Sequence, residues 1–390
     1  MKGKFLFLAL SAMALATGCS NDETTELNNG NAIDFRVTAG KLTRATATTT
    51  NNIKEFQVWA YTDSGKTTYM TGTKVTGGNG KWTYSGTKFW PETPLDFLAI
   101  SPIIPSSNTA ELTQNTNKVI NYIVEDGKTD LLYAANYGET KEAHKTDPVE
   151  VNFRHALSQI VLKAKLTENS TIDVKVKGVK IDSVQSAGIL YWAKGNTVPN
   201  LKTEGNTDTE NDSTWGSWDV SANKYATYTM NFDEKSLGKN AEEIGEPLFL
   251  LPQTLDSWLT LKDGKPQITG KARLLVNCRI VDKETGKLLW PASSDEDGFA
   301  EVAISLDNPK NDPNRGPVTD NNNDPKHDKW MQGKKYTYTL IFGEGGGYNP
   351  GPNPDPDPDP VLVPVKFEVT VDEFQNGDEI NWNANDPEKP

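Results

Sequence analysis

The chain has 390 residues, which is enough for two domains of ordinary size. Hydrophobic residues make up 35% of it and aromatic residues 9%, so cores can form and we expect no wholesale disorder. The formal net charge is −13, which offers no electrostatic footprint for a phosphate backbone, and we expect no nucleic-acid partner. Because the chain has only two cysteines and three histidines, we predict no metal site and no cofactor.

The N-terminus has the pattern of a secretory signal. Two lysines lie among the first four residues, and an apolar run over 5–16 follows that is too short to span a bilayer. The small residues before Cys19 resemble the lipobox of bacterial lipoproteins, in which the cysteine is acylated, although Ala16 stands where leucine is commoner. We therefore predict a signal peptide over 1–18 and a lipid anchor at Cys19. The alternative is an ordinary signal peptide that contains a cysteine.

Beyond residue 32 the chain alternates apolar and polar residues with a period of two, between turns rich in Gly, Asn, Asp and Pro. This pattern predicts half-buried antiparallel strands and an all-β fold of sandwich type. Only 139–147 and 233–243 leave room for a helical turn. Cys278 shares the phase of its apolar neighbours, so we predict a thiol buried in a core. The clearest alternating segments are 33–39, 56–60, 160–164, 226–232, 302–306 and 336–342.

Composition divides the chain further. The polar, acidic segment 19–32 is typical of a flexible tether, and the polar residues 167–170 predict a boundary between two strand-rich regions. A Gly-rich and then Pro-Asp-rich stretch indicates a linker, and the one alternating strand beyond it needs a sheet edge to join. The predicted parts are an N-terminal β-sandwich over 33–166, a C-terminal β-sandwich over 167–342, a linker over 343–360 and a tail over 361–390.

No catalytic motif is complete. Residues 64–67 end like a phosphate-binding loop but lack its first glycine, so a hairpin turn explains them better. Residues 320–331 have the first ligands of a calcium loop without its glycine and glutamate. The histidines lack ligand spacing, and His155 is expected to be a packed side chain. We predict that the protein is not an enzyme.

Aromatic residues flank a long polar segment, 194–216, and support one binding hypothesis. They could form a platform on which a sugar stacks, or they could anchor the segment onto the body of the protein. The four residues are Tyr191, Trp192, Trp215 and Trp218.

Several segments, in this order along the chain, resemble the fimbrillin-like lipoproteins of Bacteroides-type anaerobes. Besides the lipobox, they are 82–91, 151–160, 248–253 and 333–340. This resemblance implies two tandem transthyretin-like β-sandwich domains. It also implies a surface-exposed, lipidated pilus subunit of the outer membrane, whose partners are other pilin subunits.

The resemblance further implies maturation by cleavage after an arginine, loss of the first strand, and its replacement by a strand from a neighbouring subunit. Arg44-Ala45 is the candidate cleavage site, in a polar segment suited to proteolysis. Three large apolar side chains of the first strand represent on the order of 5–9 kcal/mol of burial. The displaced strand carries Ile33, Phe35, Val37 and Ala39, and the candidate donor strand carries Val365, Phe367, Val369 and Val371.

The long Pro-Asp linker leaves an alternative open. It would let the tail strand reach a neighbouring subunit, but it would also let the strand fold back onto its own body. In the second case the protein would be a tip or accessory adhesin that binds glycan or protein through the segments 194–216 or 307–328.

Overall fold

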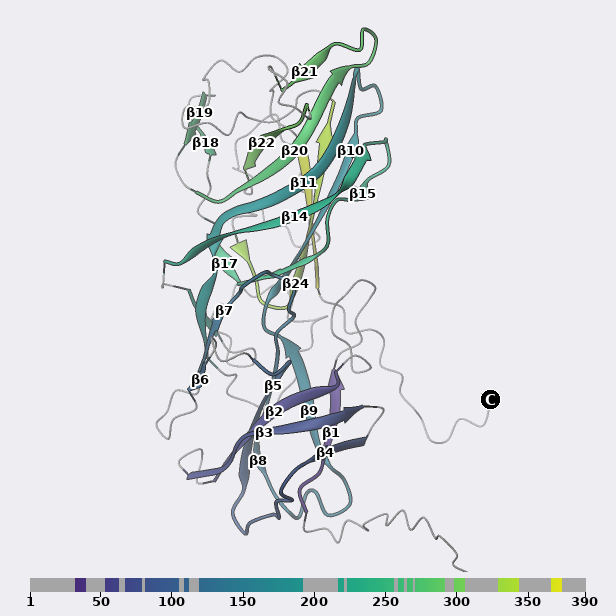
Figure 1. Cartoon of the computed structure of the whole chain (residues 1–390). Coiled ribbons are helices and arrows are strands. Elements are labelled where there is room, and N and C mark those ends of the chain that lie inside the picture. The colour runs from purple at the N-terminus through teal and green to yellow at the C-terminus, as the bar shows by residue number, and fades with distance from the viewer. Residues whose placement is uncertain are drawn as a thin grey trace, which may run out of the picture.

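The computed structural model describes residues 32–39, 53–62, 67–78, 81–104, 109–111, 119–191, 217–220, 223–255, 259–262, 265–268, 271–291, 298–305, 329–343 and 366–373. Within these ranges the elements are all β-strands, so the predicted all-β class is confirmed. Figure 1 shows one large sheet at the N-terminal end and several sheets packed together at the other end.

The N-terminal sheet has seven strands, in the order β1-β9-β8-β5-β2-β3-β4. The strand β1 pairs parallel with β9, whereas the other neighbours in the sheet are antiparallel. In sequence order the strands are β1 (Phe35–Ala39), β2 (Glu55–Thr62), β3 (Thr67–Gly78), β4 (Lys81–Tyr84), β5 (Leu95–Ser101), β8 (Leu132–Glu139) and β9 (Val149–His155). The strands β2 and β3 pair antiparallel on either side of the predicted hairpin turn, whose residues 63–66 lie outside the described ranges.

Both faces of this sheet are covered. In β2, Phe56 and Val58 belong to a core cluster that β1, β9, β8, β5 and β3 complete, while Trp59 and Tyr61 point to the opposite face. Those two residues join the larger core cluster that continues into the C-terminal sheets. The alternation of side chains along a strand explains how one strand serves two cores.

Two five-stranded sheets form most of the C-terminal part. The first has the order β15-β10-β24-β25, with β16 also paired to β10, and the second has the order β14-β11-β20-β21, with β22 also paired to β20. The bounds are β10 (Ser158–Leu166), β15 (Glu242–Glu243), β16 (Leu248–Leu250), β24 (Lys334–Phe342) and β25 (Lys366–Glu373), then β11 (Ile172–Gln185), β14 (Tyr225–Ser236), β20 (Arg273–Asp282), β21 (Leu288–Trp290) and β22 (Ala300–Ser305).

A four-stranded sheet and two strand pairs complete the architecture. The sheet has the order β13-β12-β7-β6, with β6 (Thr109–Glu111), β7 (Val119–Ile123), β12 (Ala187–Tyr191) and β13 (Ser217–Asp219). The pairs join β17 (Gln253–Thr254) to β23 (Lys329–Trp330) and β18 (Leu259–Lys262) to β19 (Lys265–Ile268).

The strand pairing does not follow the boundary predicted at 166/167. The strand β10, which we assigned to the N-terminal sandwich, pairs with β15, β16 and β24 of the C-terminal part. The chain changes sheet at Ala156 and Leu157, which are fully buried. Residues 167–170 instead form a turn between β10 and β11, so their polarity reflects solvent exposure of that turn. Conversely, β7 belongs to the predicted N-terminal sandwich but pairs with β12, which lies beyond the predicted boundary.

The two segments with room for a helical turn differ. In 139–147 the chain makes one turn, in which the amide of His144 donates to the carbonyl of Thr140 at 3.2 Å. In 233–243 the structure has the end of β14 and the strand β15. Strand pairing therefore overrides the weak local preference there.

Candidate functional site

The strand β1 occupies an edge of the N-terminal sheet. It runs parallel to β9, with Phe35 opposite Val149 and Arg36 opposite Glu150. Just before β1, the amide of Ile33 donates to the carbonyl of Lys88 at 2.9 Å, on the other side of the strand. The start of this segment is thus held from two sides. From Phe35 onward β9 is the sole strand that pairs with it in the described part of the chain.

The apolar side chains of this segment fill the interior between β1 and β4. Ile33 and Phe35 are buried, with exposed fractions of 0% and 4%, and Val37 is half-buried. The hydroxyl of Tyr84 in β4 donates to the carbonyl of Ile33 at 2.7 Å. The sheet therefore curves until its first and last strands face each other, and the segment 33–37 closes the core between them.

Phe35 lies in a pocket of three aromatic rings. Its ring is edge-on to Phe56 and to Phe97, with centroids 5.9 and 5.7 Å away, and tilted toward Tyr84 at 5.7 Å. Each such pair contributes ~0.5–1.5 kcal/mol beyond the burial of apolar area. Removal of β1 would leave this aromatic pocket open to water.

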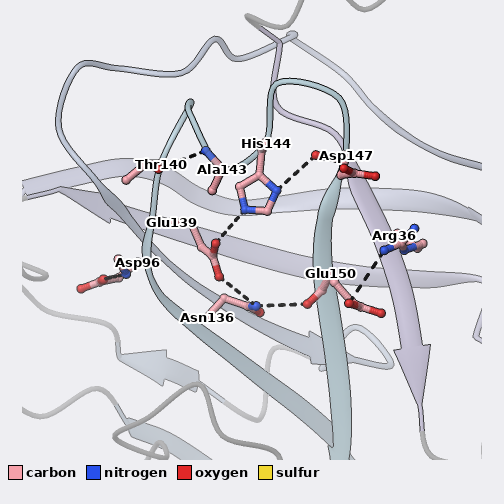
Figure 2. Close-up of polar contacts among 10 residues, drawn as sticks. Arg36, Asp96, Asn136, Glu139, Thr140, Ala143, His144, Asp147 and Glu150 are labelled. Carbon is pink, nitrogen blue, oxygen red and sulfur yellow. Dashed lines mark hydrogen bonds and ion pairs between the residues drawn. The ribbon is translucent and has the colours of Figure 1, made fainter.

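The outward side of β1 carries charge. Arg36 forms an ion pair with Glu150 at 3.8 Å, and both side chains are about half exposed (48% and 54%). The side-chain amide of Asn136 donates to the Glu150 carbonyl at 3.0 Å and to the Glu139 carboxylate at 3.3 Å. Figure 2 shows these contacts side by side, between β1, β9 and the end of β8.

His144 fixes the connection between β8 and β9. Its Nε2 lies 2.7 Å from the Glu139 carboxylate and its Nδ1 lies 3.1 Å from the carbonyl of Asp147 (Figure 2). Its ring also stacks on Trp90, with centroids 5.2 Å apart and an angle of 4° between the planes. These contacts hold β9 in place as the template on which β1 pairs.

Burial affects the titration of two groups at the start of β1. Partial burial raises the pKa of Asp34 above its ordinary value, because desolvation disfavours the carboxylate. Burial likewise raises the pKa of Tyr84, and the nearby charge of Asp34 adds to that shift. Ionisation of Asp34 therefore disfavours the docked position of β1.

The strand β25 occupies an edge of a C-terminal sheet, on the body of its own chain. It pairs antiparallel with β24, and the register runs from Lys334 opposite Glu373 to Ile341 opposite Lys366. Positions 367, 369 and 371 stand opposite Leu340, Tyr338 and Tyr336, which are all buried. The tail strand thus folds back in this structure, one of the two arrangements that the linker allows.

The strand β24 is also held from its other side. It pairs parallel with β10 over eight residues. The indole of Trp330 donates to the hydroxyl of Tyr338 at 2.9 Å, and the amide of Met331 donates to the hydroxyl of Tyr336 at 2.8 Å. The positions opposite β25 are therefore anchored by contacts that do not involve the tail.

The predicted aromatic platform is only partly described. Trp218 lies in β13 opposite Leu190, its indole donates to the carbonyl of Ala156 at 2.7 Å, and its ring contacts Tyr122 edge-on. These contacts anchor the strand onto the core, as the second interpretation of the aromatic residues predicts. Tyr191 is half-buried at the end of β12. Trp192 and Trp215 lie outside the described residues.

Other predicted site residues also lie outside the described ranges: Cys19, Arg44, Ala45 and Val365. Ala39, Phe367, Val369 and Val371 lie within β1 and β25. The structure thus places the first strand and most of the tail strand, but not the lipidation or cleavage residues. Sequence reasoning missed Phe56, Phe97, Tyr84 and Glu150 as neighbours of β1. Alternation alone could mark the aromatic residues as inward-facing, but no local signal shows which strands meet.

The remaining candidate residues, Cys278 and His155, both have buried side chains. Cys278 is fully buried in β20 and burial raises the pKa of its thiol, as expected of a core cysteine. His155 is buried, with Nδ1 2.9 Å from the carboxylate of Asp130, which confirms the packed side chain. Among the described residues there is no cluster of metal-ligating side chains. No helix in this part of the chain has the length and apolar character to cross a membrane.

The fold is similar to that of solved bacterial proteins. A fimbrial protein from Bacteroides vulgatus superimposes with a TM-score of 0.52 at 15% identity, covering 88% of this chain and 100% of that one. Two more distant structures are a proposed cell adhesion protein from Bacteroides uniformis (TM-score 0.45, 15% identity, 89% and 100% covered) and the tip fimbrial protein Mfa3 from Porphyromonas gingivalis (TM-score 0.37, 9% identity, 88% and 99% covered).

The sequence profile of the fimbrillin-like family matches residues 43–371. The chain therefore belongs to the fimbrillin-like family, as the resemblance of its motifs predicted. No curated protein matches it. Membership of this family supports a role as a pilus subunit or adhesin of the cell surface, and a role that is not enzymatic.

Proposed function

We propose that the protein is a structural subunit of a cell-surface pilus, anchored to the outer membrane as a precursor by lipid on Cys19. Cleavage after Arg44 would separate the segment that carries β1 from the rest of the chain. A strand from another pilin subunit would then take the place of β1, and the pilus would support adhesion.

The position of Phe35 carries this proposal. Its strand lies at a sheet edge and pairs with one neighbour from Phe35 onward, yet its side chain lies at the centre of a core. A strand so placed can leave without disturbing the pairing of the remaining strands. Its departure exposes both backbone groups and an aromatic pocket, and added strands satisfy both.

The tail strand supplies the matching donor. Its apolar positions repeat the alternation of β1, and it follows a Gly- and Pro-rich linker. In the described structure it lies at an edge of its own sheet. An edge strand that is tethered by a linker can exchange one sheet edge for another.

One specific observation favours a second candidate function. The tail strand pairs with β24 over eight positions of the same chain. If this pairing persists after cleavage, the subunit does not donate its tail, and a tip or accessory adhesin that binds glycan or protein is the better description.

The test is an unboiled denaturing gel of the purified precursor before and after arginine-specific proteolysis, with masses of the fragments. A polymerising subunit loses the segment that ends at Arg44 and gives a ladder of heat-labile oligomers. The variant Arg44→Gln is the matched control and stays monomeric. Clean cleavage with monomer alone would contradict the polymerising subunit and favour the tip or accessory adhesin.

A further inference from the structure

The first strand and the tail strand have related sequences with opposite charge order. Each has a central phenylalanine, Phe35 or Phe367, with an aliphatic residue two positions away on either side. In the first strand an acid precedes the phenylalanine and a base follows it. In the tail strand the base comes first and the acid second. Written forward, the two segments are Ile-Asp-Phe-Arg-Val over 33–37 and Val-Lys-Phe-Glu-Val over 365–369.

This symmetry means that the apolar pattern cannot set the direction of an incoming strand. Side chains alternate between the two faces of a strand, so Phe367 and its aliphatic neighbours face the core in either direction. The direction does decide which charged residue takes the place of Arg36. A strand that runs the same way as β1 brings Glu368 there, and a strand that runs the opposite way brings Lys366.

The place of Arg36 is acidic. Glu150 stands directly opposite in the register, and its carboxylate lies 3.8 Å from the Arg36 guanidinium. Opposite charges across a strand pair are stabilising and like charges directly opposite are destabilising. A cation is therefore favoured at this place.

We propose that the tail strand of a second copy of this chain enters the position of β1 in the opposite direction, antiparallel to β9. This inference rests on the proposed function. Phe367 then occupies the aromatic pocket of Phe35, Lys366 stands opposite Glu150, and Glu368 takes the place of Asp34. Reversed, the tail segment runs Val-Glu-Phe-Lys-Val and matches the charge order of the first strand. Antiparallel pairing is also slightly more stable per residue than parallel pairing.

The register of the tail strand on its own chain places uncharged residues opposite Lys366 and Glu368. Lys366 stands opposite Ile341 and Glu368 stands opposite Thr339, both uncharged residues. The charged matches of this register lie at the other end of the strand, where Asp372 stands opposite Lys335. Transfer to a second copy thus gives Lys366 a charged residue directly opposite.

Disulfide trapping between two full-length chains tests the direction. One chain carries Glu150→Cys and is cleaved after Arg44, and the other carries Lys366→Cys or Glu368→Cys, with Cys19→Ser in all chains. Directly opposed positions have Cβ atoms about 4.5–5.5 Å apart, whereas positions two residues along the partner strand lie about 7–8 Å away. Only the opposed pair fits the geometry of a disulfide.

The expected result is an intermolecular disulfide with Lys366→Cys and little or none with Glu368→Cys. The reverse outcome would overturn the proposed direction while leaving strand exchange intact. Oligomers without either disulfide would overturn the proposed register as well. Cleaved chains that form neither disulfides nor oligomers would refute the proposed function itself. Uncleaved Glu150→Cys chains are the control and should form no disulfide.

Charge reversal provides a second measurement. Glu150→Lys should lower the yield of oligomers about two- to fivefold, the range of exposed ion pairs, and Lys366→Glu on the donor chain should restore it. Glu142→Lys is the matched control, because Glu142 is an exposed acid of the neighbouring turn that pairs with Lys145 instead. If Lys366→Glu fails to restore the yield, Lys366 does not stand opposite Glu150.

Discussion

The two edge strands β1 and β25 share one sequence pattern but differ in what holds them. The side chains of Ile33 and Phe35 before and within β1 complete a core, and their strand runs parallel to β9. The strand β25 runs antiparallel to β24, whose buried tyrosines are already hydrogen-bonded to the segment 330–331. Loss of β1 would therefore open a core, whereas loss of β25 would leave the opposing side chains anchored.

This difference suits the two strands to distinct parts in the proposed assembly. When the loss of a strand exposes a core, the vacated sheet edge is suited to accept a replacement, because a new strand buries that core again. A strand that covers an already anchored neighbour is suited to leave and act as the donor.

The largest effect is expected from Phe35→Ala. Truncation of a buried phenylalanine typically lowers the free energy of unfolding by ~3–5 kcal/mol, and here it empties the pocket of Phe56, Phe97 and Tyr84. Denaturant unfolding of the uncleaved chain measures the loss. Arg36→Ala on the same strand is the control and should cost under ~1 kcal/mol, because its ion pair is half exposed. Equal losses in the two variants would mean that burial does not hold β1.

The register of β25 can be fixed covalently. Lys335 and Asp372 stand directly opposite each other, so the double variant Lys335→Cys/Asp372→Cys should form an intramolecular disulfide. Closing a loop of roughly forty residues would stabilise the chain by ~3–4 kcal/mol in the loop-entropy model. It should also abolish donation of the tail. Oligomers that form from the oxidised variant would contradict the role of β25 as donor.

A smaller effect is expected next to the tail strand. Tyr338→Phe removes the hydroxyl that accepts from the buried indole of Trp330. An unsatisfied buried donor typically costs ~1–3 kcal/mol, measurable as a shift of the unfolding midpoint. The same loss should appear in a chain that ends before the linker, because the bond does not involve β25. A loss that depends on the tail would mean that β25 helps to anchor the buried tyrosines of β24.

The smallest effect concerns pH. Because burial raises the pKa of Asp34, the docked strand binds a proton more tightly than the released one. Docking of β1 is therefore stronger below the ordinary carboxyl pKa of about 4 and weakens as pH rises through the raised value. Asp34→Asn should remove this dependence and hold β1 slightly more firmly at neutral pH. Hydrogen exchange of the Arg36 amide, which the parallel ladder directs toward β9, measures this dependence against pH. A Glu142→Gln variant should keep the dependence.

Part of this structure could be predicted from the sequence. Alternation located β1, β2, β10, β14, β20, β22 and β24, and the phase of Cys278 placed its thiol in a core. The alternation of apolar and polar residues within a strand shows which of its faces is buried, without any information from other strands. The all-β fold and the family followed from the same residues.

The partners of each strand could not be predicted. The parallel pairing of β1 with β9 joins residues more than a hundred positions apart, and nothing in either strand specifies the other. The strand β10 was assigned to the wrong neighbours because a polar turn at 167–170 marked the boundary more visibly than the buried residues Ala156 and Leu157. The aromatic pocket of Phe35 assembles from β2, β4 and β5 only after those pairings exist.

Strand exchange requires that β1 leaves after cleavage and that a strand of another subunit replaces it. Native mass spectrometry of the full chain, cleaved after Arg44, reports the fate of the released segment. We predict that oligomers lack the segment that ends at Arg44, while any monomer retains it without a covalent bond. Oligomers in which every subunit still holds that segment would contradict strand exchange at the position of β1.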